Sequence, residues 1–386
     1  MRAYIPDHQR RGGGEMGQYE VRSCRREDLP AVVDLLLTGG EAAPGVTAQH
    51  VHDYAASVYF DNPWMHDDLP SLVTVDANGR IEGFVGVIPR RMKLGEEEVD
   101  AVVPGNFVVR AGVDGTVNSF AALAMLKRLF SGPQTITFTD TANEASRRLW
   151  EAAGAINPGL HSLEWFRPVK PATALLQMME IARGSPLPMS PVVYTGTRSV
   201  DLLAAPVLAR MARNKALPYS LETFDEGFAL QMLNSRDRQT AIAGCYEPEC
   251  LRWLLGMVES KATGRTLRQA VVLDGQGTRA GTFIFVLSPS GVAQVLLHAA
   301  KEGRFDLVLQ AIIADASRLG ASLVTGAVQP RQLPAYKGQR SFMMCNQWTL
   351  VYSRRQDVLD TFHEGRSRLT ALDGERWTRF GDLFGI

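Results

Sequence analysis

The chain has 386 residues, of which 45% are hydrophobic, so it can supply a core to each of two domains of roughly 150 to 200 residues. Lys plus Arg and Asp plus Glu both number 41, so the formal net charge is zero. The sequence has no block of basic residues, so we do not expect a nucleic-acid partner. The apolar runs are too short to span a bilayer, and residues 1–17 lack a signal-peptide stretch. We therefore expect a cytoplasmic protein with a flexible leader at 1–17 and no membrane partner.

The residues that build common catalytic and metal sites are not arranged for those chemistries. The four cysteines are scattered, and none forms a CxxC pair with histidines at zinc-ligand spacing, which predicts reduced thiols and no bound metal. No nucleophile-elbow G-x-S-x-G motif and no Walker loop occur, so the sequence does not support a serine hydrolase or an NTPase.

The first part of the chain alternates between strand-like and helix-like hydrophobic patterns, which predicts a mixed α/β fold. The dipeptide Asn78-Gly79 lies between two apolar runs and is typical of a tight hairpin. The predicted elements, in chain order, are a strand at 19–24, helices at 29–36 and 47–59, a hairpin at 71–88, a strand at 100–110 and a helix from about 118.

Five prolines between Pro168 and Pro191 surround one short helix and predict a linker at 169–214. The residues before it, 18–168, are predicted to form one domain, and those after it, 215–386, a second. The short helix carries Leu175, Met178, Met179 and Ala182 on one stripe, which we interpret as a packed seam.

Features of the first part return after the linker in the same order. "YEVRSC" from Tyr19 corresponds to "YSLETF" from Tyr219, and "VDANG" from Val75 corresponds to "LDGQG" from Leu273. Gly83, early in the next strand, corresponds to Gly281. We interpret the common order as an internal duplication of one structural unit.

The stretch 139–155, "TDTANEASRRLWEAAGA", predicts a strand end followed by a helix. Ala145, Leu149 and Ala152 would form the apolar face of this helix, and Gly154 would end it. Asn143 stands where the strand ends. Its amide can bond the chain that enters the helix or a ligand that passes the same point.

This stretch and the element order resemble the GNAT superfamily of acyl-CoA-dependent N-acyltransferases. Asn143, Ser146, Trp150 and Gly154 stand at the spacings of Asn, a small residue, an aromatic residue and Gly in that family. The resemblance covers 19–168 and, more weakly, the second part. It implies an α/β fold with mixed sheets, made of two tandem GNAT-like domains of which the second is degenerate.

The resemblance also implies a donor site for acetyl-CoA or another acyl-CoA as co-substrate. The pantetheine arm would lie between the strand at 100–110 and the strand before Asn143, against the backbone of Phe107, Val108 and Val109. Asn143 would hold an amide of that arm. Trp150 stands where the family commonly has a Tyr that protonates the departing thiolate, and an indole cannot do so.

The family binds the CoA pyrophosphate at a glycine-rich turn before a helix, and the chain has "VRAGVDGTVNSF" from Val109 at that place. Arg110, Gly115, Thr116 and Ser119 are the candidate phosphate ligands. Asp114 stands near the position where the family usually has a basic residue, and its carboxylate would repel a pyrophosphate.

Candidates for proton transfer come from both parts of the chain. Asp100, Asp140 and the pair His161 and Glu164 are candidate bases for an amine acceptor. In the second part Tyr336 takes the place of the family's acid, or it is a surface turn residue. Gln329 stands there in the place of Asn143.

The expected function is transfer of an acyl group, most simply acetyl, from acyl-CoA to an amine of a small metabolite or sugar. One alternative is a catalytically inactive GNAT-like protein that binds a ligand or partner. Another is a transferase of the same fold whose donor is an acyl carrier or an aminoacyl-tRNA.

Overall fold

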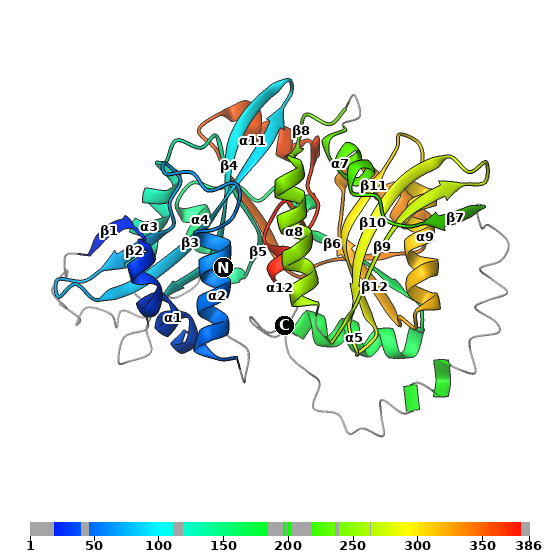
Figure 1. Ribbon diagram of the computed structural model, residues 1–386, viewed down its shortest axis with the longest axis horizontal. Coiled ribbons are helices and arrows are strands. Elements are labelled where there is room, and N and C mark those ends of the chain that lie inside the picture. Colours follow the sequence, from blue (N-terminus) through cyan, green and yellow to red (C-terminus); the bar gives the residue numbers. More distant parts are fainter. Residues whose placement is uncertain are drawn as a thin grey trace, which may run out of the picture.

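Figure 1 shows the computed structural model, in which two mixed β-sheets are separated and flanked by helices. The structure describes residues 19–39, 46–110, 119–183, 196–197, 199–201, 218–235, 239–262 and 264–379. The predicted fold class, α/β with mixed sheets, is confirmed.

The first sheet has eight strands within the described residues. Six of them form a continuous path, and β8 and β15 extend the sheet beside the far end of β3. In path order the strands are β1 (Glu20–Ser23), β2 (Leu72–Val75), β3 (Ile81–Leu94), β4 (Glu97–Val109), β5 (Ile136–Ala142) and β14 (Trp348–Tyr352), with β8 (Ile242–Cys245) and β15 (Ser367–Arg368) off this path.

The second sheet has seven strands in the described part of the chain. From edge to edge they are β13 (Phe342–Cys345), β6 (Leu163–Pro168), β12 (Leu323–Ala327), β11 (Val292–Ala300), β10 (Arg279–Leu287), β9 (Thr266–Asp274) and β7 (Tyr219–Glu222). The series β7-β9-β10-β11-β12 repeats the series β1-β2-β3-β4-β5, with three antiparallel pairs followed by one parallel pair in each sheet.

Helices lie on both faces of each sheet. They are α1 (Leu29–Thr38), α2 (Ala48–Tyr59), α3 (Ser119–Phe130), α4 (Glu144–Ala152), α5 (Pro171–Arg183), α7 (Glu226–Asn234), α8 (Pro248–Lys261), α9 (Phe305–Arg318), α10 (Leu333–Gly338), α11 (Gln356–His363) and α12 (Arg376–Arg379), together with the 3-10 turns η1 (Arg26–Asp28), η2 (Gly159–Ser162) and η4 (Pro330–Gln332).

The hairpins that were predicted to correspond have the same turn. Asp76 Oδ1 accepts hydrogen bonds from the backbone N–H groups of Asn78 at 2.9 Å and Arg80 at 2.8 Å. Asp274 Oδ1 does the same for Gln276 and Thr278, both at 3.0 Å. The glycine of each turn adopts a positive φ, which is 79° at Gly79 and 77° at Gly277, and this conformation favours glycine over other residues.

Strands are exchanged between the two sheets. β6 follows α4 in the chain but pairs with β12 in the second sheet. β14, from near the end of the chain, pairs with β5 in the first sheet, and β8 pairs with β3 there as well. The predicted domain ranges 18–168 and 215–386 therefore do not coincide with the two sheets, and they stay a prediction about folding units.

One large hydrophobic core lies between the two sheets. It joins residues of α1, α2, α7 and α8 with apolar side chains of both sheets, such as Phe84 and Ile88 on β3 and Ile284 on β10. Figure 1 shows α8 standing between the sheets. Smaller clusters lie on the outer faces, beneath α3 and α4 on the first sheet and beneath α9 and α10 on the second. The packing is thus continuous across the two halves.

The stripe on α5 is not the packed seam that the sequence predicted. Leu175 is 59% exposed and Met179 is 46% exposed, whereas Met178 packs against the small cluster at Phe166. Separately, a search of the described residues finds no helix that is long and apolar enough to cross a bilayer.

Candidate functional site

The strands β4 and β5 pair only where they begin. Among the described residues, the parallel ladder between them joins 101–102 to 136–137, and both strands continue well beyond these pairs. Past these pairs, the edge of β4 that faces β5 and the edge of β5 that faces β4 are not joined by a ladder, while their other edges pair with β3 and β14. We call the opening between residues 103–109 and 138–142 the first gap.

A bulge in β4 forms one wall of the first gap. The pairing of β4 with β3 shifts register between Phe84 and Gly86, and Asn106 adopts a φ of 50°. Tyr59, at the end of α2, donates a hydrogen bond from Oη to Asn106 Oδ1 at 2.5 Å. A Cβ at Gly86 would lie 2.2 Å from the ring of Tyr59, and a Cβ at Gly105 would lie 2.9 Å from its Oη. These two glycines therefore let a hydroxyl group approach the backbone of β4.

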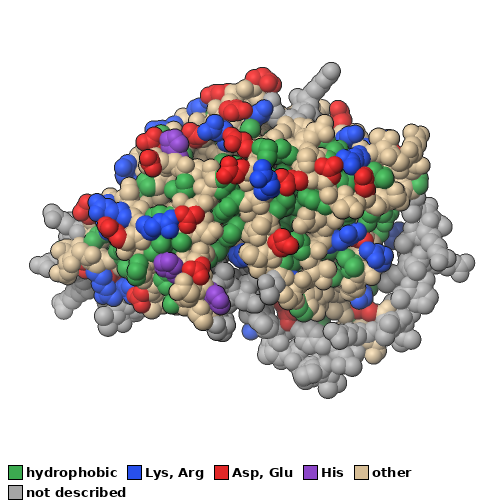
Figure 2. Space-filling model, viewed as in Figure 1, with side chains coloured by type: hydrophobic (Ala, Val, Ile, Leu, Met, Phe, Trp, Pro, Cys, Tyr) green, Lys and Arg blue, Asp and Glu red, His purple; other side chains and the backbone are tan. Residues whose placement is uncertain are grey.

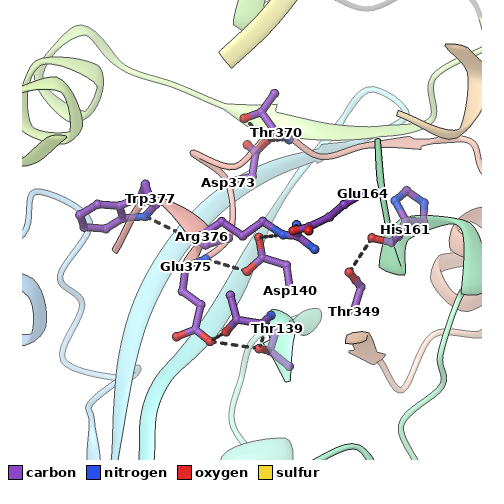
Figure 3. A network of polar contacts seen from close by, with 12 residues as sticks. Thr139, Asp140, His161, Glu164, Thr349, Thr370, Asp373, Glu375, Arg376 and Trp377 are labelled. Carbon is purple, nitrogen blue, oxygen red and sulfur yellow. Dashed lines mark hydrogen bonds and ion pairs between the residues drawn. The ribbon is translucent and has the colours of Figure 1, made fainter. Parts of the chain in front are cut away.

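The carboxylate of Glu375 lies between the two strands of the first gap (Figure 3). Its Oε1 accepts a hydrogen bond from Thr139 Oγ1 at 3.3 Å and another from Thr141 Oγ1, both on β5. Its Oε2 lies 3.0 Å from the position of a Cβ on Gly105, in β4. Glu375 is 5% exposed, so this carboxylate is held inside the protein.

The two faces of the first sheet show how Glu375 reaches this place. Phe138 on β5 and Leu372 and Trp377 of the C-terminal segment pack in the core between the sheets, whereas Thr139 pairs with Leu350, which belongs to the cluster on the opposite face. Asp140 Oδ1 accepts the backbone N–H of Glu375 at 2.9 Å. The backbone of Glu375 is thus on the core side of the sheet, and its side chain extends through the first gap.

Arg376 joins two acidic residues beside the first gap. Its Nη1 forms an ion pair with Glu164 on β6, and its Nε lies 3.4 Å from Asp140 Oδ2. The Arg376 side chain is 4% exposed, so these charges interact in a poorly hydrated environment. Figure 3 shows the guanidinium between the two carboxylates. This contact joins β5 of the first sheet to β6 of the second.

A second polar group anchors the same C-terminal segment. Asp373 accepts hydrogen bonds from Tyr246 Oη at 2.6 Å and from Thr370 N at 2.6 Å. Arg90 Nε donates to the backbone carbonyl of Asp373 at 3.1 Å, and its guanidinium lies 4.2 Å from the ring centroid of Trp64. Burial lowers the pKa of Arg90, and burial together with the charge of Asp373 raises the pKa of Tyr246. These contacts fix the segment that presents Glu375.

His161 lies near this network but does not face the first gap. Its Nε2 is 2.7 Å from Ser367 Oγ, and its carbonyl accepts a hydrogen bond from Thr349 Oγ1 at 2.8 Å (Figure 3). Burial lowers the pKa of His161 to about 4, so the ring is neutral at pH 7. Its contacts join η2 to β14 and β15.

The three residues that the sequence predicted as catalytic are in three different places. Asp140 lies within β5, in the buried network. Asp100 lies on the exposed part of β4, with Arg91 Nε 4.0 Å away. Tyr336 is fully buried in the second half, where its Oη accepts the backbone N–H of Gln329 at 3.3 Å, and burial raises its pKa. The alternative of a surface turn residue does not hold for Tyr336.

The predicted donor residues that the structure describes lie on β4, beside α1 and on α4. Phe107, Val108 and Val109 follow the bulge on β4. Arg110 Nη2 forms an ion pair with Asp34 at 3.0 Å, on the α1 side of the sheet. Gly115 and Thr116 lie outside the described residues, as does the side chain of Ser119, whose backbone begins α3.

The remaining two donor residues belong to α4. Asn143 is the N-cap of this helix, because its Oδ1 accepts the backbone N–H of Ser146 at 2.9 Å. Trp150 is buried, with its ring centroid 5.2 Å from that of Phe130. Of the two roles considered for Asn143, the contact with the chain is the one that the structure contains.

Sequence reasoning did not find Glu375, Arg376, Tyr59 or Asn106. The stretch 369–379 has no amphipathic period, and Asp373-Gly374 suggests only a turn. No sequence signal places it beside 139–141. A prediction would have needed the pairing of β14 with β5, which carries the following segment to the first sheet.

Comparison with known proteins gives no match to a family model or to a curated protein, but it does give similar solved structures. A GCN5-related N-acetyltransferase from Anabaena variabilis ATCC 29413 has a TM-score of 0.56 at 11% identity, over 88% of this chain and 74% of that one. The fold is that of the GCN5-related N-acetyltransferases. An N-acetyltransferase of this GNAT type from Kribbella flavida has a TM-score of 0.50 at 13% identity, over 89% and 72% of the two chains.

A third similar structure comes from Enterococcus faecalis V583 and is described as a conserved protein of unknown function and a probable N-acyltransferase. It has a TM-score of 0.54 at 11% identity, and the match covers 87% of this chain and 72% of that one. The matches extend over most of this chain, so the GNAT-type fold includes both sheets. The first gap lies between β4 and β5, the strands between which the sequence resemblance expects the pantetheine arm.

Proposed function

We propose that the chain is an N-acyltransferase that moves an acyl group, most simply acetyl, from a CoA thioester to an amine of a small metabolite or sugar. The observation that carries this proposal is the first gap of a GNAT-type fold, with a buried carboxylate held between its strands. A carboxylate at that point suits a reaction in which an amine must lose a proton.

The residues at the first gap fit an acyl-CoA donor. The backbone of β4 after the bulge has groups that are not used by the ladder with β5, and these can bond the amides of a pantetheine arm. An N–H group of 107–109 that faces the gap would polarise the thioester carbonyl. The donor itself supplies the activated acyl group and a thiolate leaving group.

Proton delivery to the thiolate needs no dedicated acid in this proposal. Trp150 has no ionisable proton to give and is buried against Phe130, and Tyr336 is buried in the other half. An unperturbed thiol has a pKa of about 8.5, so a thiolate leaves readily near neutral pH and can take its proton from water.

Charged side chains of both signs lie at the site. The carboxylates of Asp140, Glu164, Asp373 and Glu375 lie near the guanidinium groups of Arg90 and Arg376, and Lys261 Nζ donates to the carbonyl of Thr378 in the same segment. The surface in Figure 2 has acidic and basic side chains interspersed, without a broad basic field for a nucleic acid. A small amine acceptor suits a surface of this kind.

Calorimetric titration of acetyl-CoA tests the proposal. We expect micromolar binding by the wild type and loss of binding in Gly115→Trp, whose side chain would enter the predicted pyrophosphate loop. Gly303→Trp is the matched variant, because Gly303 precedes α9 in the equivalent place of the second sheet. No atom lies within 4 Å of an added Cβ, but the φ of 72° strains any side chain there, so a thermal melt must first show that this variant folds. Binding lost in Gly303→Trp alone would place the donor in the second half. No binding by the wild type would reject the acyl-CoA donor and favour the carrier-donor or non-catalytic alternatives.

A further inference from the structure

We propose that Arg167, Arg340 and Ser341 form a binding site for a phosphate group in the second half of the molecule, apart from the first gap. This inference goes beyond the proposed function and does not depend on acyl transfer. It rests on the place where these residues meet, on a half-buried guanidinium without an acidic partner, and on buried polar atoms without hydrogen bonds.

Arg167 lies near the end of β6, on the face of the second sheet that α9 and α10 cover. Its partner across the ladder is Val324 of β12, which belongs to the apolar cluster on that face. On the other edge of β6, the antiparallel ladder with β13 joins Phe166 to Phe342. Ser341 comes one residue before Phe342, so the register brings Ser341 beside Arg167.

The turn that ends α10 brings Arg340 to the same place. The backbone N–H of Arg340 donates to the carbonyl of Lys337 at 2.9 Å, and that of Ser341 donates to the carbonyl of Tyr336 at 3.0 Å. Arg340 adopts a φ of 57°, in the left-handed region that commonly ends a helix. Arg340 is exposed and Arg167 is half-buried, so an anion can approach the pair from the Arg340 side.

Arg167 has no acidic partner among the described residues. Its Nη1 donates to the carbonyl of Pro168 at 2.7 Å, and its Nε is buried without a hydrogen bond. Burial and the positive charge of Arg340 both lower the pKa of Arg167, but a guanidinium stays charged in proteins. Two like charges that lie together, one of them half-buried, cost free energy unless an anion joins them.

Two other half-buried arginines have an acidic partner within the chain. Arg22 Nη1 lies 2.7 Å from Asp28 Oδ2, and Arg268 Nε lies 2.6 Å from Asp315 Oδ2. Arg167 differs from both, because the only described side chain whose charge shifts its pKa is another arginine. We therefore expect a ligand to supply the negative charge.

A phosphate group suits this set of donors. Arginine binds phosphate oxygens through two parallel N–H groups, and a phosphate ester carries about two negative charges at pH 7, which matches two guanidinium groups. Ser341 adds a hydroxyl group whose Oγ is buried and has no hydrogen-bond partner in the described part of the chain. A carboxylate carries a single charge, so it would leave one guanidinium group without a partner.

Calorimetric titration of the full chain tests this site with inorganic phosphate and with glucose 6-phosphate, at an ionic strength held constant with sodium chloride. We expect saturable binding at one site per chain. In Arg167→Met and in Arg340→Met the affinity should fall about tenfold or more, the factor that corresponds to one charge-assisted hydrogen bond. The tighter of the two probes shows whether the ligand is free phosphate or a phosphate ester.

Arg279→Met is the matched control. It removes an arginine of the same half whose guanidinium is paired with Glu222 and Asp225, and it should bind both probes as the wild type does. A thermal melt shows whether each variant folds. If Arg167→Met does not fold, Arg340→Met decides, because Arg340 is exposed. Sodium acetate is the control for the class of anion and should bind more weakly than either phosphate probe.

The remaining outcomes would overturn the site or its ligand. No binding by the wild type, or unchanged binding in a folded Arg167 or Arg340 variant, would overturn the site. Tighter binding of acetate would reject the phosphate group. Saturating acetyl-CoA should leave the binding of phosphate unchanged, and competition between them would reject a site separate from that of the donor. Phosphate binding by a protein that does not bind acetyl-CoA would support the site and reject the proposed donor.

Discussion

In the first sheet the parallel ladder at the gap joins 101–102 to 136–137, and in the second sheet it joins 292–295 to 323–326. The ladder is thus longer in the second sheet, although the strand order is the same. Beyond these pairs β11 continues to Ala300, so an equivalent second gap lies between β11 and β12. The two gaps differ in the side chains that fill them.

Neutral side chains fill the second gap. Some belong to the second part of the chain, and one lies on β6, which comes from the first part. Gln329 Nε2 donates to the carbonyl of His298 on β11 at 2.8 Å. Trp165 on β6 has its ring centroid 5.4 Å from that of Tyr336, and Tyr336 also contacts Phe305. These side chains bond the β11 backbone and pack as a core, in the place where the first gap contains Glu375.

The difference shows that the acidic group of the first gap depends on the strand exchange. β14 pairs with β5, so the chain after Tyr352 continues over the first sheet and brings Glu375 to the first gap. In return, β6 brings Trp165 to the second gap. Each half completes the gap of the other, and only one of the two receives a carboxylate.

The largest effect on stability is expected from the buried cation at the first gap. Arg376→Met would leave Asp140 and Glu164 without their shared guanidinium, and we expect a loss of about 3–5 kcal/mol in the free energy of unfolding. Urea denaturation measures this value. Arg279→Met is the matched variant in the second half, because its ion pairs with Glu222 and Asp225 are exposed, and it should change stability little. Similar losses of stability in both variants would contradict the expectation that the buried ion pairs of Arg376 matter more than the exposed ion pairs of Arg279.

A smaller effect is expected from pH, through the histidines. Burial lowers the pKa of His298 to about 3 and that of His161 to about 4, below the unfolded value of about 6.5. The unfolded chain therefore takes up protons first as pH falls, so the full stability is present above pH 6.5 and decreases below it. Between pH 6.5 and 4.5 each histidine should cost about 2–3 kcal/mol.

The variant His298→Leu tests how much of this loss of stability at low pH comes from His298, beside the second gap. The ring of His298 is buried and stacks on that of Phe305, with the ring centroids 3.9 Å apart, so an apolar side chain should be tolerated at pH 7. Urea midpoints at pH 7 and pH 4.5 should differ less in His298→Leu than in the wild type. An unchanged difference would mean that His298 is not neutral and buried in the folded protein.

The smallest effect is expected for the hydroxyl of Tyr336. Tyr336→Phe removes the hydrogen bond with Gln329 N and should cost about 0.5–1.5 kcal/mol of stability. We expect no change in acyl transfer, because Tyr336 lies in the second gap. A large fall in the rate of transfer would show instead that the second half supplies the acid, as the sequence resemblance suggested for this position.

Local structure could be predicted from local sequence. Thr47 and Asn143 cap α2 and α4, and each accepts a hydrogen bond from the residue three positions later, as short polar side chains at the start of a helix often do. The hairpins with Gly79 and Gly277 follow from the residues that tolerate a positive φ. The repeated order of these signals indicated the repeated strand order.

The site could be predicted only in part. Asp140 was a candidate because it follows an apolar strand, and the structure places it in the buried network. Asp100 was chosen because it precedes the next strand and Tyr336 because it takes the place of the family's acid, yet one is exposed and the other lies in the opposite half. Proximity to a strand end does not tell which side chains meet when the sheets come from distant segments.

The sequence by itself determined the elements, their order and their duplication, because hydrophobic periods, caps and turn residues act over a few neighbouring positions. Only the tertiary structure decided that β6 and β14 change places and that Glu375 lies in the first gap. The reason is physical: the pairing of strands that are far apart in the chain depends on which side chains pack across the finished sheets, and no local pattern records that choice.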